Sequence, residues 1–149
     1  METMRIWVLV ADPMRARIVR DAMSQLSDGP AELVLRARNR RVRSVMMDSA
    51  VSRAVAETSE TSAEASRLLL EEDVENFACM LVDILESHYR AGEFDRFAIV
   101  AVAPFMDILR SMLTASLRSV LLAAIVRDLT RLPAAELRAT TKQILAEMP

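Results

Sequence analysis

The 149-residue chain has few of the residues on which small catalytic and metal-binding domains depend: two Gly, one Cys, one His and one Lys. A single Cys excludes an internal disulfide, and Cys79 with His88 cannot complete a structural zinc site. Gly29 and Gly92 are too far apart for a P-loop or a dinucleotide-binding loop. We expect both scarce side chains to be structural, His88 near a helix C-terminus and Cys79 in or near the core.

Long apolar runs are also missing. The longest uncharged stretch, 97–106, contains Pro104 and is far shorter than a membrane span. The N-terminus lacks the basic region and cleavage site of a secretory signal. We therefore expect a cytoplasmic protein without a membrane span.

Charge is present but unevenly distributed. The basic residues are almost all Arg, and the net charge of −2 combines +4 over residues 1–53 with −6 over residues 54–149. Such asymmetry indicates surfaces with different partners. Hydrophobic residues make up 52% of the chain, which predicts a folded domain.

The hydrophobic pattern predicts one α/β domain over residues 1–149. Strands are expected at 6–10, 15–20 and 32–38, joined by short turns into an antiparallel meander. Residues 39–60 are polar and rich in Arg and Ser, which indicates a long loop. A capping box at 61–64 predicts a helix to about residue 91, where Gly92 would stop it.

The second half alternates strands and helices. A buried strand is expected at 94–103, a helix at 105–117 after Pro104, a strand at 119–126, and a helix from Pro133 to about residue 147. The order βββαβαβα predicts a mixed sheet, with the strand after the long helix parallel to the first strand.

Four segments in this order resemble the bacterial host-attachment protein family, which is itself similar to the middle domain of archaeo-eukaryotic peptide-chain release factors. They are 7–12 followed by 15–18, Asp48-Ser49-Ala50 followed by 53–55, 94–96 followed by 99–101, and Asp128-Leu129-Thr130-Arg131-Leu132-Pro133 followed by 136–137. The resemblance implies a ribonuclease H-like five-stranded sheet, three strands antiparallel and two parallel. Release factors of this type use a Gly-Gly-Gln loop, whereas residues 39–60 contain neither Gly nor Gln. We therefore expect no peptidyl-tRNA hydrolysis by that mechanism.

Arginines form the strongest candidate binding feature. Alternate residues of an extended segment share one face, so Arg36, Arg38 and Arg40 would form a basic stripe that Arg15 and Arg17 continue on a neighbouring strand. Forked guanidinium donors suit phosphates. The full candidate set is Arg15, Arg17, Arg36, Arg38, Arg40, Arg41, Arg43 and Arg53. The alternative is a charged face that protects an exposed strand from aggregation.

Asp12, Asp48 and Asp128 are the candidate metal ligands. Asp12 and Asp128 both follow apolar strands, where carboxylates can hold Mg²⁺. The alternative is that Asp12 belongs to a turn and Asp128 to a loop or cap.

The favoured hypothesis is a non-catalytic member of the family, without a cofactor, that binds tRNA, the ribosome or another macromolecule through its arginine face. Two alternatives remain. One is a protein-interaction or self-associating module, for example in host-cell attachment. The other is a metal-dependent hydrolase of ribonuclease H-like type.

Overall fold

The computed structural model describes residues 4–22, 32–37 and 60–147, with the backbone alone for 60–70. The elements are β1 (Ile6–Ala11), β2 (Arg15–Val19), β3 (Leu33–Arg36), α3 (Glu60–Arg90), β4 (Arg96–Ala101), α4 (Ala103–Met112), α5 (Ala115–Val120), β5 (Leu121–Val126) and α6 (Ala134–Ala146). The predicted loop at 39–60 lies outside the described residues, except that Glu60 already belongs to α3.

The five strands form one open sheet in the order β3-β2-β1-β4-β5. β1 pairs antiparallel with β2, which pairs antiparallel with β3, while β4 and β5 run parallel to β1. The predicted combination of three antiparallel and two parallel strands is confirmed. β1 and β4 are central, and their continuous apolar runs are buried on both faces, as strands inside an α/β sheet require.

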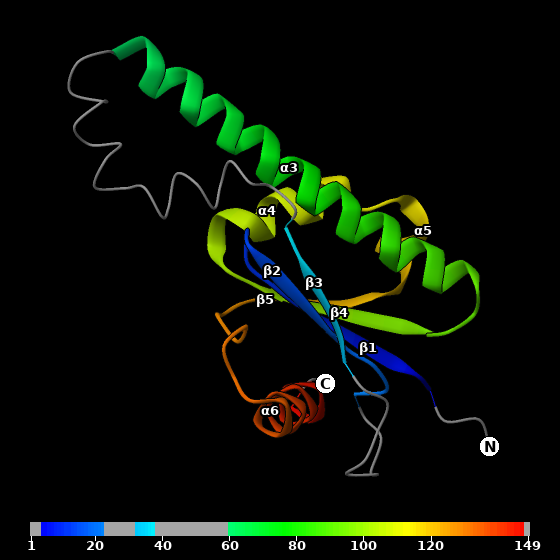
Figure 1. The fold of residues 1–149 in the computed structure, drawn as a ribbon. Coiled ribbons are helices and arrows are strands. Elements are labelled where there is room, and N and C mark those ends of the chain that lie inside the picture. Colours follow the sequence, from blue (N-terminus) through cyan, green and yellow to red (C-terminus); the bar gives the residue numbers. More distant parts are fainter. Residues whose placement is uncertain (1–3, 23–31, 38–59, 148–149) are drawn as a thin grey trace.

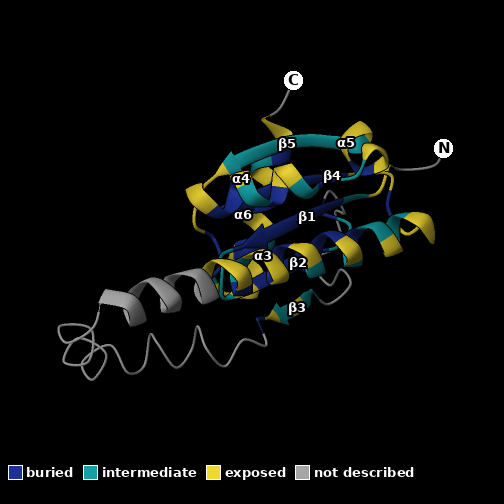
Figure 2. Cartoon of the chain, turned by 90° about the horizontal axis from the view of Figure 1, so that it is seen from above, coloured by how far each residue is buried: buried dark blue, intermediate teal, exposed yellow. Residues whose placement is uncertain are grey.

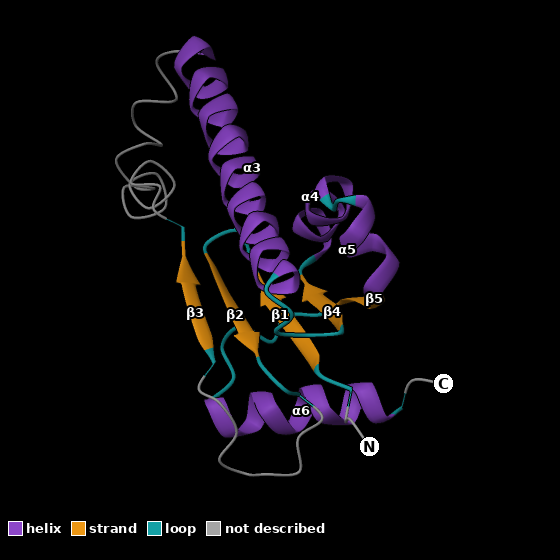
Figure 3. Cartoon of the chain, turned by 90° about the vertical axis from the view of Figure 1, so that its right-hand side faces the viewer, coloured by secondary structure: helices purple, strands orange, loops and turns teal. Residues whose placement is uncertain are grey.

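Helices cover both faces of the sheet. Figures 1 and 3 show α3, α4 and α5 on one side and α6 on the other. The larger core lies on the α3 side, where Phe77, Leu81 and Leu85 of α3 pack against alternate residues of the strands. The smaller core lies beneath α6, with Leu137 and Leu145 against Val8 and Val10. No helix in the described ranges is long and apolar enough to cross a membrane.

The predicted capping box is wrong as a helix start, because α3 already begins at Glu60 and Thr61 therefore lies inside the helix. Two other helix signals act as expected. Gly92, two residues after the end of α3, has φ of 75°, a left-handed conformation that Gly adopts without strain. Pro104 lies in the first turn of α4, where its missing N–H leaves no bond unmade. His88 lies in the last turn of α3, with its ring centroid 5.1 Å from that of Trp7 and Nδ1 bonded to Glu93 Oε2.

Two further predictions are wrong. Residues 119 and 120 belong to α5 rather than to a strand, because the Thr114 hydroxyl accepts a hydrogen bond from Leu117 N at 3.3 Å and caps a new short helix. The order of the elements in the described residues is therefore βββαβααβα. Cys79 is exposed, because it lies on the face of α3 opposite the apolar stripe.

Candidate functional site

Several candidate residues lie at one margin of the sheet, formed by the ends of its strands. β1, β3, β4 and β5 all end there, and β2 begins there, since β2 alone runs in the opposite direction. We call it the carboxyl edge. Ligands of open α/β sheets commonly bind at this edge. It contains Asp12, Arg15, Arg36, Arg127 and Asp128.

Arg15 and Arg36 face each other across the outer two strands. They are direct register partners between β2 and β3, and both residues are exposed. Ala16 and Ile18 point into the α3-side core, so Arg15 points to the α6 side, and its partner Arg36 shares that face. Like charges directly opposite each other in an antiparallel pair repel. Arg15 Nε has only a loose contact with Asp12 Oδ2, at 3.9 Å.

Arg17, on the same face as Arg15, has a different environment. Only 8% of the residue is exposed. Its Nε and Nη2 donate to Glu32 Oε1 at 2.9 and 2.6 Å, and its Nη1 donates to the carbonyls of Thr130, at 3.2 Å, and Leu132. The guanidinium therefore ties β2 to the segment that follows β5. Because hydrogen bonds within the chain occupy the Arg17 guanidinium, its environment does not favour the phosphate-binding role that strand alternation predicts.

Asp12 holds the turn between β1 and β2. Its Oδ1 accepts the main-chain N–H groups of Met14 and Arg15 at 2.7 and 2.8 Å. Its Oδ2 accepts the Thr130 hydroxyl at 3.0 Å. Both oxygens are therefore engaged, and the geometry is that of an Asx turn with an added long-range tie.

Asp12 and Asp128 meet through the hydroxyl of Thr130. Thr130 is 2% exposed, and its Oγ1 lies 2.8 Å from Asp128 Oδ1 as well as 3.0 Å from Asp12 Oδ2. A hydroxyl has one proton, so it donates to one carboxylate at a time. Both carboxylates follow apolar strands, as the sequence predicts, and the structure places the ends of these two strands at the carboxyl edge.

The remaining candidates are not placed. Arg38, Arg40, Arg41, Arg43, Arg53 and Asp48 lie outside the described residues. Within the described ranges, no group of three or more His, Cys, Asp and Glu side chains could hold a metal ion. The three-carboxylate magnesium site stays a prediction.

Sequence reasoning missed two exposed arginines, Arg127 and Arg131. Arg131 lies between Thr130, which bonds to Asp12, and Leu132, whose carbonyl bonds to Arg17. These hydrogen bonds hold the main chain at Arg131 near β2, the strand that carries Arg15. Both residues lie in or beside the segment 128–133, where single arginines separated by apolar and acidic residues give no basic run in the sequence.

A family model described as "Protein required for attachment to host cells" matches residues 7–140. The chain belongs to this family. The match to the host-attachment family includes both sides of the carboxyl edge, from the turn at Asp12 to the segment around Thr130. A search of the curated proteins finds none that matches the chain.

Proposed function

We propose that this host-attachment family member binds the phosphate backbone of RNA through the arginines of its carboxyl edge, without catalysing a reaction. Arg15 and Arg36 form the centre, with Arg131 in the segment that Arg17 fixes to β2 and Arg127 directly after β5. The observation that carries the proposal is the direct pairing of exposed Arg15 with exposed Arg36. An anion between two opposed guanidiniums would replace their repulsion with charge-assisted hydrogen bonds.

Two features support a site that is free to bind. Within the part of the chain that the structure describes, Arg36 makes no ion pair, and Arg15 makes only the 3.9 Å contact with Asp12. Residues 38–43, which follow directly from the end of β3, add four more arginines to the chain at this point. The local excess of positive charge therefore starts at Arg36 and continues along the sequence.

The aromatic residues favour contact with the backbone rather than with bases. Single-stranded RNA binders commonly stack bases on exposed aromatic rings. All six aromatic residues of this chain lie in the α3-side core or pack against it: Trp7, Phe77, Tyr89, Phe94, Phe97 and Phe105. We therefore expect binding that depends strongly on salt and weakly on RNA sequence.

A translation-related RNA is the partner that the resemblance to release-factor middle domains implies. The absence of a Gly-Gly-Gln loop from the chain supports binding without ester hydrolysis. The hydrogen bonds of Asp12 likewise support binding over metal-dependent hydrolysis, since both of its oxygens already hold the turn and Thr130.

The test is fluorescence anisotropy with labelled bulk tRNA at low salt. We expect Arg15→Gln/Arg36→Gln to weaken binding about tenfold, a loss of about 1.4 kcal/mol from two phosphate contacts. Arg90→Gln/Arg96→Gln is the matched control, because it removes the same charge from two exposed residues away from the carboxyl edge, Arg90 in the last turn of α3 and Arg96 at the first position of β4. Binding by the control should change less than twofold.

Two results would contradict the proposal. Equal loss in both double variants would mean that binding reflects net charge rather than this edge. Absence of binding by the wild-type chain, even at low salt, would exclude an RNA partner of this class. Co-purification of protein without RNA would then favour the protein-interaction alternative, including the attachment role in the family description.

A further inference from the structure

An open cavity of about 460 Å³ lies beside the first residue of β5, at the end of that strand away from the carboxyl edge. Leu113 and Leu121 form its apolar part, and α4 and α5 supply its polar walls. In Figure 2, α4 and α5 carry exposed positions near the mostly half-buried β5. Cavities of this size accommodate small organic molecules and use a few polar groups to orient them.

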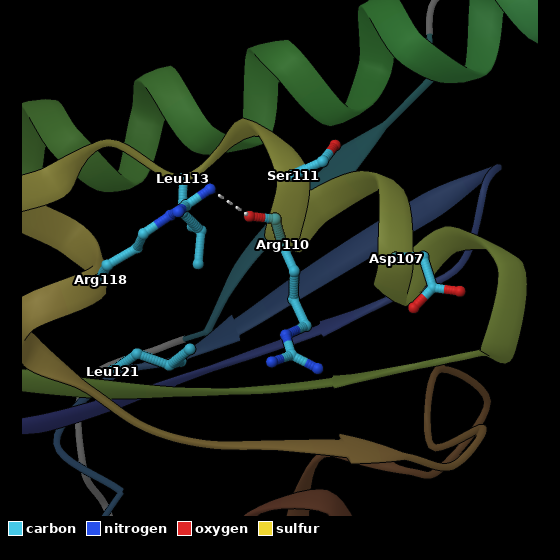
Figure 4. A pocket seen from close by; sticks show the side chains of 6 residues that line it. All are labelled: Asp107, Arg110, Ser111, Leu113, Arg118 and Leu121. Carbon is cyan, nitrogen blue, oxygen red and sulfur yellow. Dashed lines mark hydrogen bonds between the residues drawn. The ribbon is translucent and has the colours of Figure 1, made fainter.

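Two arginines and one aspartate supply the charges of this cavity. Asp107 and Arg110 lie one turn apart on α4, and Arg118 lies in the last turn of α5. Figure 4 shows the Arg110 side chain extending from α4 toward Leu121. Among the residues that the structure describes, the Arg110 guanidinium and the Asp107 carboxylate form no ion pair with each other or with another side chain. Both groups are therefore available to a ligand.

Arg118 is oriented by the end of α4. Its Nη2 donates to the Arg110 carbonyl at 3.3 Å, as the dashed line in Figure 4 shows. This carbonyl lies in the last turn of α4, where carbonyls lack partners within the helix. A guanidinium carries five N–H groups, so one hydrogen bond orients Arg118 and leaves other donors for a ligand. The cavity therefore has two guanidiniums, one of them already held in position.

The remaining polar groups of the cavity are acceptors. The Ser111 hydroxyl donates its one proton to the Ile108 carbonyl at 2.7 Å, which leaves its lone pairs for a ligand. The ionised carboxylate of Asp107 also only accepts hydrogen bonds. A ligand that satisfies all of these groups must carry an anion for the guanidiniums and hydrogen-bond donors for the two acceptors.

We propose that this cavity binds a phosphorylated sugar, either free or as the ribose phosphate of a nucleoside monophosphate. The phosphate oxygens accept hydrogen bonds from Arg110 and Arg118, and the sugar hydroxyls donate to Asp107 and Ser111. Two guanidiniums against one carboxylate leave a net positive charge, which favours a phosphate ester over a neutral zwitterion such as a free amino acid. Inorganic phosphate would leave the acceptors unused. The proposal does not depend on RNA binding at the carboxyl edge.

Isothermal titration calorimetry of the full chain with ribose 5-phosphate and with AMP tests the proposal. Arg110→Gln should weaken the binding of both ligands about tenfold, because it removes a forked donor to the phosphate. The Arg110 guanidinium has no ion pair among the described residues, so this variant should fold normally. Arg110→Lys keeps the charge without the fork and should recover only part of the affinity. Arg36→Gln is the matched control, since it removes the same charge from an exposed arginine at the carboxyl edge and should leave the affinity unchanged.

Asp107→Ala separates recognition of the sugar from binding of the anion. It removes both an acceptor for hydroxyls and a charge that repels phosphate, so the preference for ribose 5-phosphate over inorganic phosphate should fall about fivefold. Equal affinity of the wild type for these two ligands would contradict recognition of the sugar. Absence of binding at millimolar ribose 5-phosphate and AMP, or equal loss in Arg110→Gln and Arg36→Gln, would overturn the proposal.

Amide resonances of the wild type supply a readout that does not depend on the folding of a variant. Saturating ribose 5-phosphate should shift the amide signals of Leu113 and Leu121, which line the cavity. The amide of Val34, on the other outer strand, should not shift. Saturable shifts confined to residues outside the cavity would contradict binding at this place.

Discussion

At the scale of single residues, Thr130 joins the segments that follow the central strand β1 and the outer strand β5. Its buried hydroxyl lies within hydrogen-bond distance of Asp12, after β1, and Asp128, after β5. These carboxylates are thereby held close together, although both are acceptors. The hydroxyl is the donor that makes this arrangement favourable.

Thr130→Val should lower the free energy of unfolding by about 1–3 kcal/mol, because it leaves the carboxylates without their shared donor. Thr141→Val is the matched control. Thr141 is equally buried, at 1% exposure, but its hydroxyl bonds only to carbonyls of its own helix, those of Leu137 and Arg138. Urea unfolding measures both changes. A loss in Thr130→Val no larger than in Thr141→Val would contradict the role given to Thr130.

Asp95 should give the chain a local pH dependence. Its Oδ2 accepts the main-chain N–H of Arg5 at 2.8 Å, and this hydrogen bond is the main reason that the pKa of Asp95 is lowered from its ordinary value of 3.8. A lowered pKa in the folded state stabilises the fold above the ordinary pKa, and this contribution is lost as the pH falls through the lowered value.

Asp95→Asn should therefore be less stable than the wild type at neutral pH, and the two should converge as the pH falls well below 3.8. Urea midpoints measured across this range check the prediction. A difference that stays constant with pH would show that the carboxylate charge does not contribute.

At the scale of elements, the segment after β5 is fixed to β2 by Arg17. The guanidinium joins Glu32, before β3, to the carbonyls of Thr130 and Leu132. One side chain thereby connects both antiparallel strands to the segment that leads into α6. The ion pair is largely buried, with side-chain exposures of 10% for Arg17 and 20% for Glu32.

Arg17→Leu should destabilise the chain by about 2–4 kcal/mol, because it leaves Glu32 partly buried without its partner. Arg15→Leu, on the same strand and face but exposed, should change the free energy of unfolding by less than about 0.5 kcal/mol. Thermal or urea unfolding of the two variants tests the contrast. Equal destabilisation would mean that the ties of Arg17 contribute little to the fold.

Sequence periodicity predicted the strands and helices better than the side-chain contacts between them. The apolar runs of β1 and β4 and the stripe on α3 follow from spacing alone, because burial imposes the period. α5 was missed, because its cap at Thr114 is a local signal inside an apolar stretch that also suits a strand. The separation of Arg15 from Arg17 could not be predicted, since both occupy the same face and only contacts with Glu32 and the distant carbonyls distinguish them.

At the scale of the whole molecule, the carboxyl edge and the outer strand β5 differ in charge. The carboxyl edge carries opposed, exposed arginines, whereas the outer side of β5 carries no charge. The first suits a polyanion, because its guanidiniums can form charge-assisted hydrogen bonds with phosphates.

The salt dependence of tRNA binding tests the proposed function most directly. Each phosphate contact contributes about 0.7–0.9 to the slope of log affinity against log salt concentration. We expect Arg15→Gln/Arg36→Gln to reduce the wild-type slope by roughly 1.5, and Arg90→Gln/Arg96→Gln to leave it unchanged. An unchanged slope in the first double variant would show that these arginines do not contact RNA phosphates.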